Sequence, residues 1–359
     1  MMRFLIALLG IGLVFVLGGV AEAQGTQPVE DPALPTQVLE AQQAWRDKFN
    51  SVIKWEGDQQ QELRPEFADL KQHLRNLELM SSGLTFLGEN KLKELAEVQV
   101  RLIKKYQDSP PQTVENLGMY REALLQHGSL CVDLAEPVLA RQRAEQAWSI
   151  HQKLMTPAVA ASDRGVRDTM ATCLRLAVMW LGSDRPRNAQ KYLNIAYENS
   201  EKMKVNPLRG EVFLLKSVVS NTQHAFGQAS HSSAQALEIF RRQFPHGHPK
   251  IAIAQCQLAT AQLGLGKLQE AKELLQNADN VLKSRPQGTK QLHAEVYRML
   301  AQLHLEKGED LVAFRCAARS RELYLSLFSG FPKSHPNLIA ALSSLAELLN
   351  RFRQRDVNG

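Results

Sequence analysis

The sequence predicts an all-α protein built as an α-solenoid of stacked helical hairpins. Aromatic residues make up only 6% of the 359 residues, and helix-forming Ala, Leu, Gln, Glu, Lys and Arg dominate over alternating β-branched runs. Small residues recur at helical spacing with a period near 42 residues. A chain of this length divides into domains or stacks repeats, and the recurrence favours stacked repeats.

The clearest repeat unit covers residues 251–282, where two helical patterns are separated by Gly266. Ala259 belongs to the first pattern, and Ala271 and Ala278 belong to the second. Small side chains are needed where the helices of a hairpin approach closely, and glycine adopts the positive φ that ends a helix. We therefore expect residues 251–282 to form a helical hairpin that turns at Gly266.

The N-terminal segment predicts an exported protein. A basic start ending at Arg3 precedes 17 uncharged residues at 4–20, and small residues at 21 and 23 form a cleavage site. We expect a signal peptide over residues 1–23. The alternative is an uncleaved membrane anchor, because this apolar length lies near the shortest that spans a bilayer. Residues 24–36 contain three prolines and are expected to form a disordered linker.

Residues 37–111 are predicted to form an N-terminal helical region that can hold divergent repeats. Helical patterns occur at 37–53, 63–87 and 92–106, the last two forming a pair that Pro110-Pro111 closes. Small residues do not recur clearly at the repeat spacing in this region.

Residues 112–335 carry the readable repeat in both helices of each hairpin. The steps between the small residues of successive first helices are 49, 40, 42 and 42 residues, and the longest step predicts an insertion at 156–167. These first-helix residues are Gly128, Ala177, Ser217, Ala259 and Ala301. Each second helix carries two small residues seven apart, namely Ala140 and Ala147, Ala189 and Ala196, Ala229 and Ala236, Ala271 and Ala278, and Ala313 and Ser320.

Two His-Pro pairs support this phasing. His248-Pro249 and His335-Pro336 precede predicted first helices, and proline suits the first helical turn because its missing N–H needs no partner there. Residues 336–359 are predicted to form a capping helix and tail, because apolar residues from Leu338 to Phe352 share one face and no second helix follows.

The four cysteines do not form the pattern of a disulfide framework. Their spacings of 42, 83 and 60 residues include no CxxC motif, and each lies in or beside a helical pattern. We expect buried thiols, with a pair between neighbouring hairpins as the alternative.

No catalytic constellation is readable. Neither a P-loop, a GxSxG elbow nor an HExxH helix occurs. Four histidines at 224, 231, 246 and 248 invite a metal site, but no carboxylate or thiol stands at ligand spacing. The acid pairs Asp163 with Asp168 and Glu309 with Asp310 are interpreted as solvated helix surface. We predict a non-enzyme without metal or cofactor.

Charge is unevenly distributed along the chain. Residues 24–100 hold 13 acidic and 8 basic side chains, whereas residues 101–359 hold 23 acidic and 34 basic ones, a net charge of +11. Such a basic body could attract an anionic polymer or membrane surface. Nucleic acid is not expected, because no Lys/Arg block interleaves with aromatic residues.

The repeat residues resemble the tetratricopeptide-repeat family in its 42-residue, kinesin-light-chain-like form. The resemblance rests on Ala236-Leu237-Glu238-Ile239, on His248-Pro249, and on Leu258-Ala259 through Gly266 to Glu270-Ala271 and Ala278. Two hairpins depart from the family, with Asp184 and His224 in place of the turn glycine. The resemblance implies a right-handed superhelix whose concave face, lined by first helices, binds peptides or partner proteins.

On this phasing, five polar side chains project from the first helices and are the predicted partner-binding residues: Arg175, Asn221, Thr260, Arg298 and Gln302. We therefore predict an exported, non-catalytic scaffold of the periplasm or cell envelope that binds a protein or peptide. Two alternatives stay open: a binder of anionic envelope polymer or membrane surface, and an accessory subunit of an envelope enzyme complex. Membrane association is expected only if the N-terminal signal is uncleaved.

Overall fold

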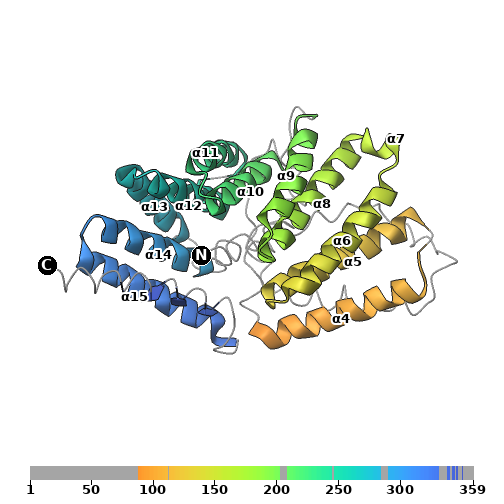
Figure 1. The fold of residues 1–359 in the computed structure, drawn as a ribbon, viewed down its shortest axis with the longest axis horizontal. Helices are drawn as coiled ribbons and strands as arrows, with labels where there is room; N and C mark the ends of the chain where they lie inside the picture. Colours follow the sequence, from red (N-terminus) through yellow and green to blue (C-terminus); the bar gives the residue numbers. More distant parts are fainter. Residues whose placement is uncertain are drawn as a thin grey trace.

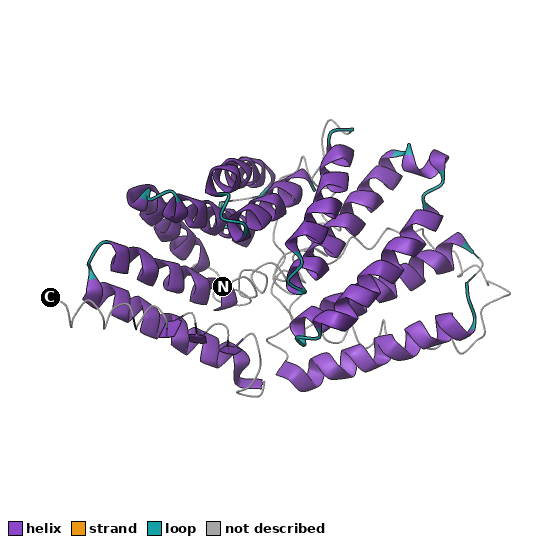
Figure 2. Cartoon of the chain, viewed as in Figure 1, coloured by secondary structure: helices purple, strands orange, loops and turns teal. Residues whose placement is uncertain are grey.

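The computed structural model describes residues 88–111, 113–202, 208–244, 246–283 and 290–330, together with seven helical positions between 338 and 350. The predicted signal peptide, the linker and the helices at 37–53 and 63–87 lie outside these residues. The described elements are helices, without strands in the ranges above (Figure 2). They are α4 (Gly88–Asp108), α5 (Val114–Asp133), α6 (Pro137–Leu154), α7 (Pro157–Ala160), α8 (Asp163–Gly182), α9 (Pro186–Ser200), α10 (Arg209–Thr222), α11 (Phe226–Gln243), α12 (Pro249–Gly264), α13 (Leu268–Lys283), α14 (Lys290–Glu306), α15 (Asp310–Leu327) and the 3₁₀ turn η3 (Phe328–Gly330).

The helices pack as five successive hairpins: α5 with α6, α8 with α9, α10 with α11, α12 with α13, and α14 with α15. Each second helix also contacts the first helix of the next hairpin, and successive first helices contact one another. The predicted all-α solenoid of stacked hairpins is therefore confirmed. The short helix α7 accounts for the insertion expected at 156–167.

The small residues that defined the repeat lie inside the hairpins. The ten small residues of the second helices are all buried, and so are the five small residues of the first helices. At Gly128 of α5 a Cβ atom would lie 1.9 Å from the Cε atom of Met179 in α8, so a side chain of the next hairpin occupies the space beside this glycine. Ser320, which stands where the other hairpins have alanine, donates its hydroxyl to the carbonyl oxygen of Ala294 at 2.7 Å. A buried hydroxyl is therefore tolerated at this position.

The turn inside each hairpin uses one residue in the left-handed region. Gly266 and Gly308 have φ values of 74° and 73°, and Ala135, Asp184 and His224 reach 61°, 59° and 59°. The three hairpins whose turn residue is Ala135, Asp184 or His224 thus adopt the same turn as the two that have glycine there. A non-glycine residue in this conformation costs roughly 1–2 kcal/mol, which packing of the flanking helices offsets.

The histidine at the start of α12 has the predicted helix-entry role. His248 precedes Pro249, and its Nδ1 accepts a hydrogen bond from the backbone N–H of Lys250 at 3.1 Å. Its ring also stacks on Phe244, with centroids 3.9 Å apart. His335-Pro336 lies outside the described residues. Of the predicted capping helix, Leu338 and Leu345 are buried at helical positions.

The stack curves until its two described ends meet (Figure 1). Helix α4 contacts η3, and one cluster of buried apolar residues joins Leu92 and Ala96 of α4 to Tyr324 and Phe328 at the C-terminal end. The repeat pattern did not predict this contact.

Three of the four cysteines are buried, as expected, and all four are free thiols. Burial raises the pKa of Cys131 to about 12 and also raises the pKa values of Cys173 and Cys256. Cys316 is half-buried. No helix within the described ranges is both long and apolar enough to span a membrane.

Candidate functional site

The five predicted partner-binding residues all lie on first helices. Arg175 is on α8, Asn221 on α10, Thr260 on α12, and Arg298 and Gln302 on α14. Arg175, Asn221 and Arg298 are buried, with exposed fractions of 3%, 4% and 6%. Thr260 and Gln302 are half-buried. The structure therefore divides the predicted set into a buried group and a partly accessible group.

Arg175 connects α8 to α5. Its Nη1 lies 2.6 Å from Oε2 of Glu122, and both side chains are largely shielded from solvent. The other oxygen of Glu122 accepts from Gln126 at 2.9 Å, and Gln126 accepts from Gln99 of α4 at 2.7 Å. A polar chain thus runs from α4 through α5 to α8.

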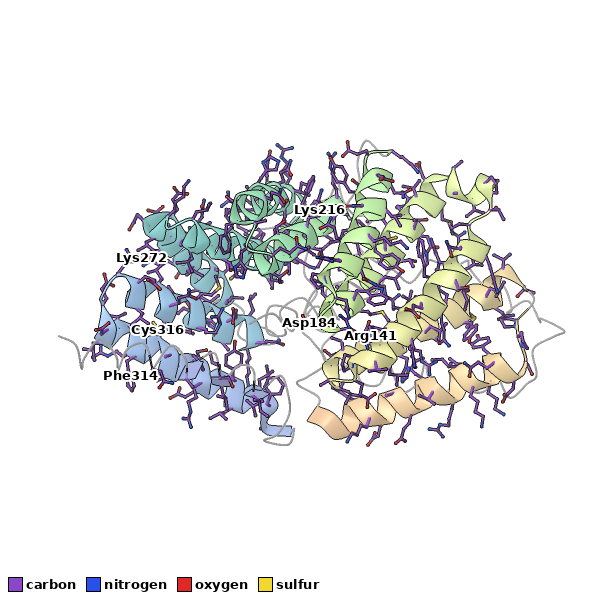
Figure 3. The ribbon with its side chains drawn as sticks, in the orientation of Figure 1. Arg141, Asp184, Lys216, Lys272, Phe314 and Cys316 are labelled. Carbon is purple, nitrogen blue, oxygen red and sulfur yellow. The ribbon has the colours of Figure 1, made fainter. Side chains whose placement is uncertain are left out.

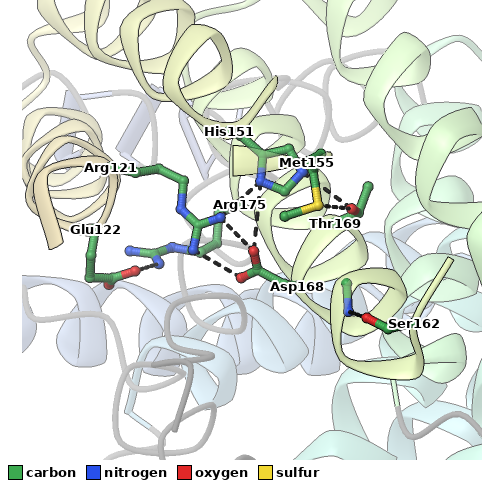
Figure 4. Close-up of polar contacts among 9 residues, drawn as sticks. Arg121, Glu122, His151, Met155, Ser162, Asp168, Thr169 and Arg175 are labelled. Atoms are coloured by element: carbon green, nitrogen blue, oxygen red, sulfur yellow. Dashed lines mark hydrogen bonds and ion pairs between the residues drawn. The ribbon is translucent and has the colours of Figure 1, made fainter. Parts of the chain in front are cut away.

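A second polar cluster lies beside this chain (Figure 4). Arg121 donates two hydrogen bonds to the carboxylate of Asp168, at 2.6 and 2.9 Å, which is the bidentate geometry of a strong Arg–carboxylate pair. Arg121 also donates to Nδ1 of His151 at 2.8 Å. Because arginine can only donate, Nδ1 is the acceptor, and Nε2 carries the proton and donates to Thr169 at 3.2 Å. Burial, reinforced by the charge of Arg121, lowers the pKa of His151 to about 4. The imidazole is therefore neutral near pH 7.

The later first helices are joined in the same way. Asn221 of α10 donates to the backbone and side-chain oxygens of Gln257 of α12, at 3.1 and 3.2 Å. The hydroxyl of Thr260 lies 3.8 Å from the sulfur of Met299 on α14. These contacts link α10 to α12 and α12 to α14.

Arg298 is engaged within the last hairpin. It forms a buried ion pair with Glu295, one turn earlier on α14, and Nε donates to Oε2 at 2.7 Å. The hydroxyl of Tyr324 on α15 donates to the same oxygen at 3.0 Å. Glu295 therefore accepts from Arg298 on its own helix and from Tyr324 on the second helix of the same hairpin.

One repeat position of the first helices holds a glutamate that the sequence interpretation missed; it is half-buried in the first hairpin and buried in the third and fifth. In the first, third and fifth hairpins a glutamate stands six residues before the small residue, and the partner of each is a cation. These pairs are Glu122 with Arg175 at 2.6 Å, Glu211 with Lys250 at 2.8 Å, and Glu295 with Arg298. The signal was readable, because a glutamate in phase with the repeat and inside an apolar run requires a partner.

The histidine group does not assemble into a metal centre. His224, His231 and His246 are exposed, whereas His248 is buried in its helix-entry contact. Among the residues that the structure describes, no group of three or more metal-ligating side chains occurs. Of the acid pairs set aside above, Asp168 proves to be bound to Arg121 and is not merely solvated, which is a correction to the sequence interpretation.

No protein-family model and no curated protein matches the chain significantly. Among solved structures it is similar to BtubC (BKLC) from P. vanneervenii, with a TM-score of 0.52 and 16% identity over 67% of this chain and 94% of that one. It is also similar to the apo form of RapI, with a TM-score of 0.49 and 13% identity over 75% and 69% of the two chains. A third similar structure is PH0952 from Pyrococcus horikoshii, a signal transduction ATPase with a tetratricopeptide repeat sensor, with a TM-score of 0.43 and 14% identity over 79% and 49%. At such identities the likeness concerns the fold alone.

Proposed function

We propose, on the premise of a tetratricopeptide-repeat-like fold, that this chain is an exported, non-catalytic scaffold that binds a protein or peptide partner along its first helices. The observation that carries the proposal is the unbroken row of laterally contacting first helices α5, α8, α10, α12 and α14. Such a row offers one continuous surface to an extended or helical partner.

Thr260 and Gln302 are the side chains best suited to touch the partner. Each directly follows the small residue of its helix, so the two occupy the same repeat position on adjacent helices α12 and α14. Both are half-buried, which leaves polar atoms near the surface. Polar side chains repeated at one position can bind the backbone of a partner at regular intervals.

Arg175, Asn221 and Arg298 support this surface from within. The contacts of Arg175 with Glu122 and of Asn221 with Gln257 join the first helices that carry it, and Arg298 pairs with Glu295 on its own helix. Direct contact between these three residues and a partner stays a prediction.

A pull-down from envelope extract tests the proposal. The immobilised protein carrying Thr260→Ala and Gln302→Ala should lose at least one protein that the wild type recovers. The matched control is Gln276→Ala, an exposed glutamine on second helix α13, which should recover the same proteins as the wild type. If the double variant recovered the same proteins as the wild type, the row of first helices would be ruled out as the binding surface.

Export is part of the proposal and has its own test. Small residues at Ala21 and Ala23 follow the apolar stretch, so the mature chain should begin at Gln24. Mass spectrometry of the protein from the periplasmic fraction should find this N-terminus. A full-length chain that sediments with membranes would instead support the uncleaved anchor.

The charge of residues 101–359 favours a second candidate, a binder of anionic envelope polymer. Salt discriminates between the two, because the Debye length falls from about 10 Å at 0.1 M to about 3 Å at 1 M. Polymer binding should be lost over this range, whereas capture through an apolar and hydrogen-bonded surface should persist.

A further inference from the structure

Exposed apolar side chains form a stripe along helix α15 of the last hairpin. Leu311, Phe314 and Leu325 of α15 have exposed fractions of 64%, 49% and 39%, and Ala318 between them is also exposed. These residues follow one another at intervals of three, four and seven, so they lie on one face of the helix. We call them the α15 stripe. Figure 3 shows Phe314 on α15, near one end of the arc.

The same positions are polar in the earlier second helices. In α6, α9, α11 and α13 the residue equivalent to Phe314 is polar, as is the residue equivalent to Leu325. The first set is Arg141, Gln190, Ser230 and Lys272, and the second set is Gln152, Glu201, Arg241 and Lys283. At the position of Leu311 only Val138 is a comparable apolar residue. The other hairpins are exposed at the position of Leu325 and half-buried at the position of Phe314. The last hairpin departs from its own repeat at both positions, which favours a contact surface.

The α15 stripe is symmetric about Ala318. Leu311 lies seven residues before Ala318 and Leu325 lies seven residues after it. If two such helices pack antiparallel about a two-fold axis at Ala318, Leu311 of each copy meets Leu325 of the other. The small side chain at the centre lets the backbones approach closely, as the alanines inside the hairpins do.

The flanks of the stripe are complementary under the same operation. Arg315 and Glu322 lie on one flank, three residues before and four residues after Ala318, so Arg315 of one copy faces Glu322 of the other. Phe314 and Arg321 lie on the opposite flank at comparable offsets. Arg315, Arg321 and Glu322 are all exposed, and Glu322 also contacts Arg319 at 2.9 Å in its own helix.

We propose that two copies of this chain associate as an antiparallel two-fold dimer through the α15 stripe. The symmetric order of the apolar residues and the opposite charges of Arg315 and Glu322 favour a second copy over an unrelated partner, because the two-fold operation pairs both. The face is about 21 Å long, from 14 residues at about 1.5 Å each, and buries few large side chains. Its area falls at the small end of specific interfaces, so reversible association at micromolar concentration is expected.

Sedimentation equilibrium of the full chain across the micromolar range tests the dimer. The wild-type average mass should rise from one copy toward two, and Ala318→Glu should remain at one. Ala234→Glu is the matched control, because Ala234 is the equivalent exposed alanine on α11. It makes the same chemical change outside the stripe and should dimerise like the wild type. Equal melting temperatures of the two variants would show that both fold.

A charge exchange tests the pairing itself. Arg315→Glu and Glu322→Arg should each weaken association about tenfold, and the double variant should recover it because the pair is restored with reversed signs. Recovery is expected for the antiparallel two-fold arrangement, because it places Arg315 of each copy against Glu322 of the other.

Three results would overturn the proposal. A wild type that stays monomeric throughout the range would do so, as would equal dimerisation of Ala318→Glu, or failure of the double charge exchange to recover association. If the monomeric wild type instead bound anionic vesicles and Ala318→Glu did not, the stripe would belong to a membrane contact.

Discussion

The turn residue of the first hairpin offers a quantitative test of the repeat geometry. Ala135 has φ of 61°, in the same turn position as Gly266 at 74°. An L-residue in this region costs roughly 1–2 kcal/mol. Replacing alanine by glycine removes that cost but adds about 0.4–1 kcal/mol of unfolded-state entropy. Ala135→Gly should therefore stabilise the protein by about 0.5–1 kcal/mol.

The reverse substitution completes the test. A Cβ atom at Gly266 would meet nothing within 4 Å, so Gly266→Ala changes backbone strain without a steric clash. It should destabilise the protein by about 0.5–1 kcal/mol, from the same two contributions with opposite sign.

Urea denaturation followed by circular dichroism measures both effects as shifts of the midpoint at constant slope. Hydrogen exchange at the ends of α5 and α6 should localise the gain from Ala135→Gly to the first hairpin. If both substitutions moved stability in the same direction, the turn would not be governed by backbone strain.

Three further predictions follow from packing, charge and protonation. Gly264→Ala should destabilise by about 1–3 kcal/mol, because its Cβ atom would lie 2.4 Å from the ring of Phe226; urea denaturation measures the loss. Glu211→Gln should destabilise by about 3 kcal/mol in the same assay, because it leaves the buried ammonium of Lys250 without its carboxylate. Stability should fall as the pH is lowered from about 6.5 to about 4, because unfolded His151 takes up a proton in this range and the folded residue does not; denaturation midpoints at several pH values measure it.

Each of these predictions has a control. Gly118→Ala, where a Cβ atom meets nothing within 4 Å, should stabilise helix α5 by about 0.5–1 kcal/mol. Replacing the ion pair as a whole, with Glu211→Leu and Lys250→Met, should cost less than Glu211→Gln alone. His151→Gln should reduce the loss of stability between about pH 6.5 and about pH 4. It should not abolish this loss, because burial also lowers the pKa of His127 to about 4. An unchanged pH dependence of stability in this variant would contradict the role assigned to His151.

The hairpins were predictable because the small residues that they require lie close together in the sequence. Ala271 and Ala278 are buried because no larger side chain fits between two close helices, and that requirement appears in the sequence as small residues at helical spacing. The turns at Asp184 and His224 were less evident, since a residue other than glycine can occupy the left-handed region when the flanking helices hold it.

The candidate site was predictable only in part. The phasing placed Arg175, Asn221 and Arg298 on first helices, as the structure has them. Their burial was not foreseen, because it depends on Glu122, Gln257 and Glu295. Two of these partners come from neighbouring first helices. Helical periodicity does not predict which side of a neighbouring helix faces a given residue.

By itself, the sequence determined that this chain folds into stacked hairpins, since close helix packing requires small residues at regular intervals and the turns require particular backbone conformations. Only the tertiary structure decided that polar first-helix residues pair with one another, that α4 meets the far end of the stack, and that α15 exposes a stripe of apolar side chains. The reason is that repeat spacing specifies contacts between adjacent elements. Ion pairs across helices and closure of the arc depend instead on rotations summed over the whole stack.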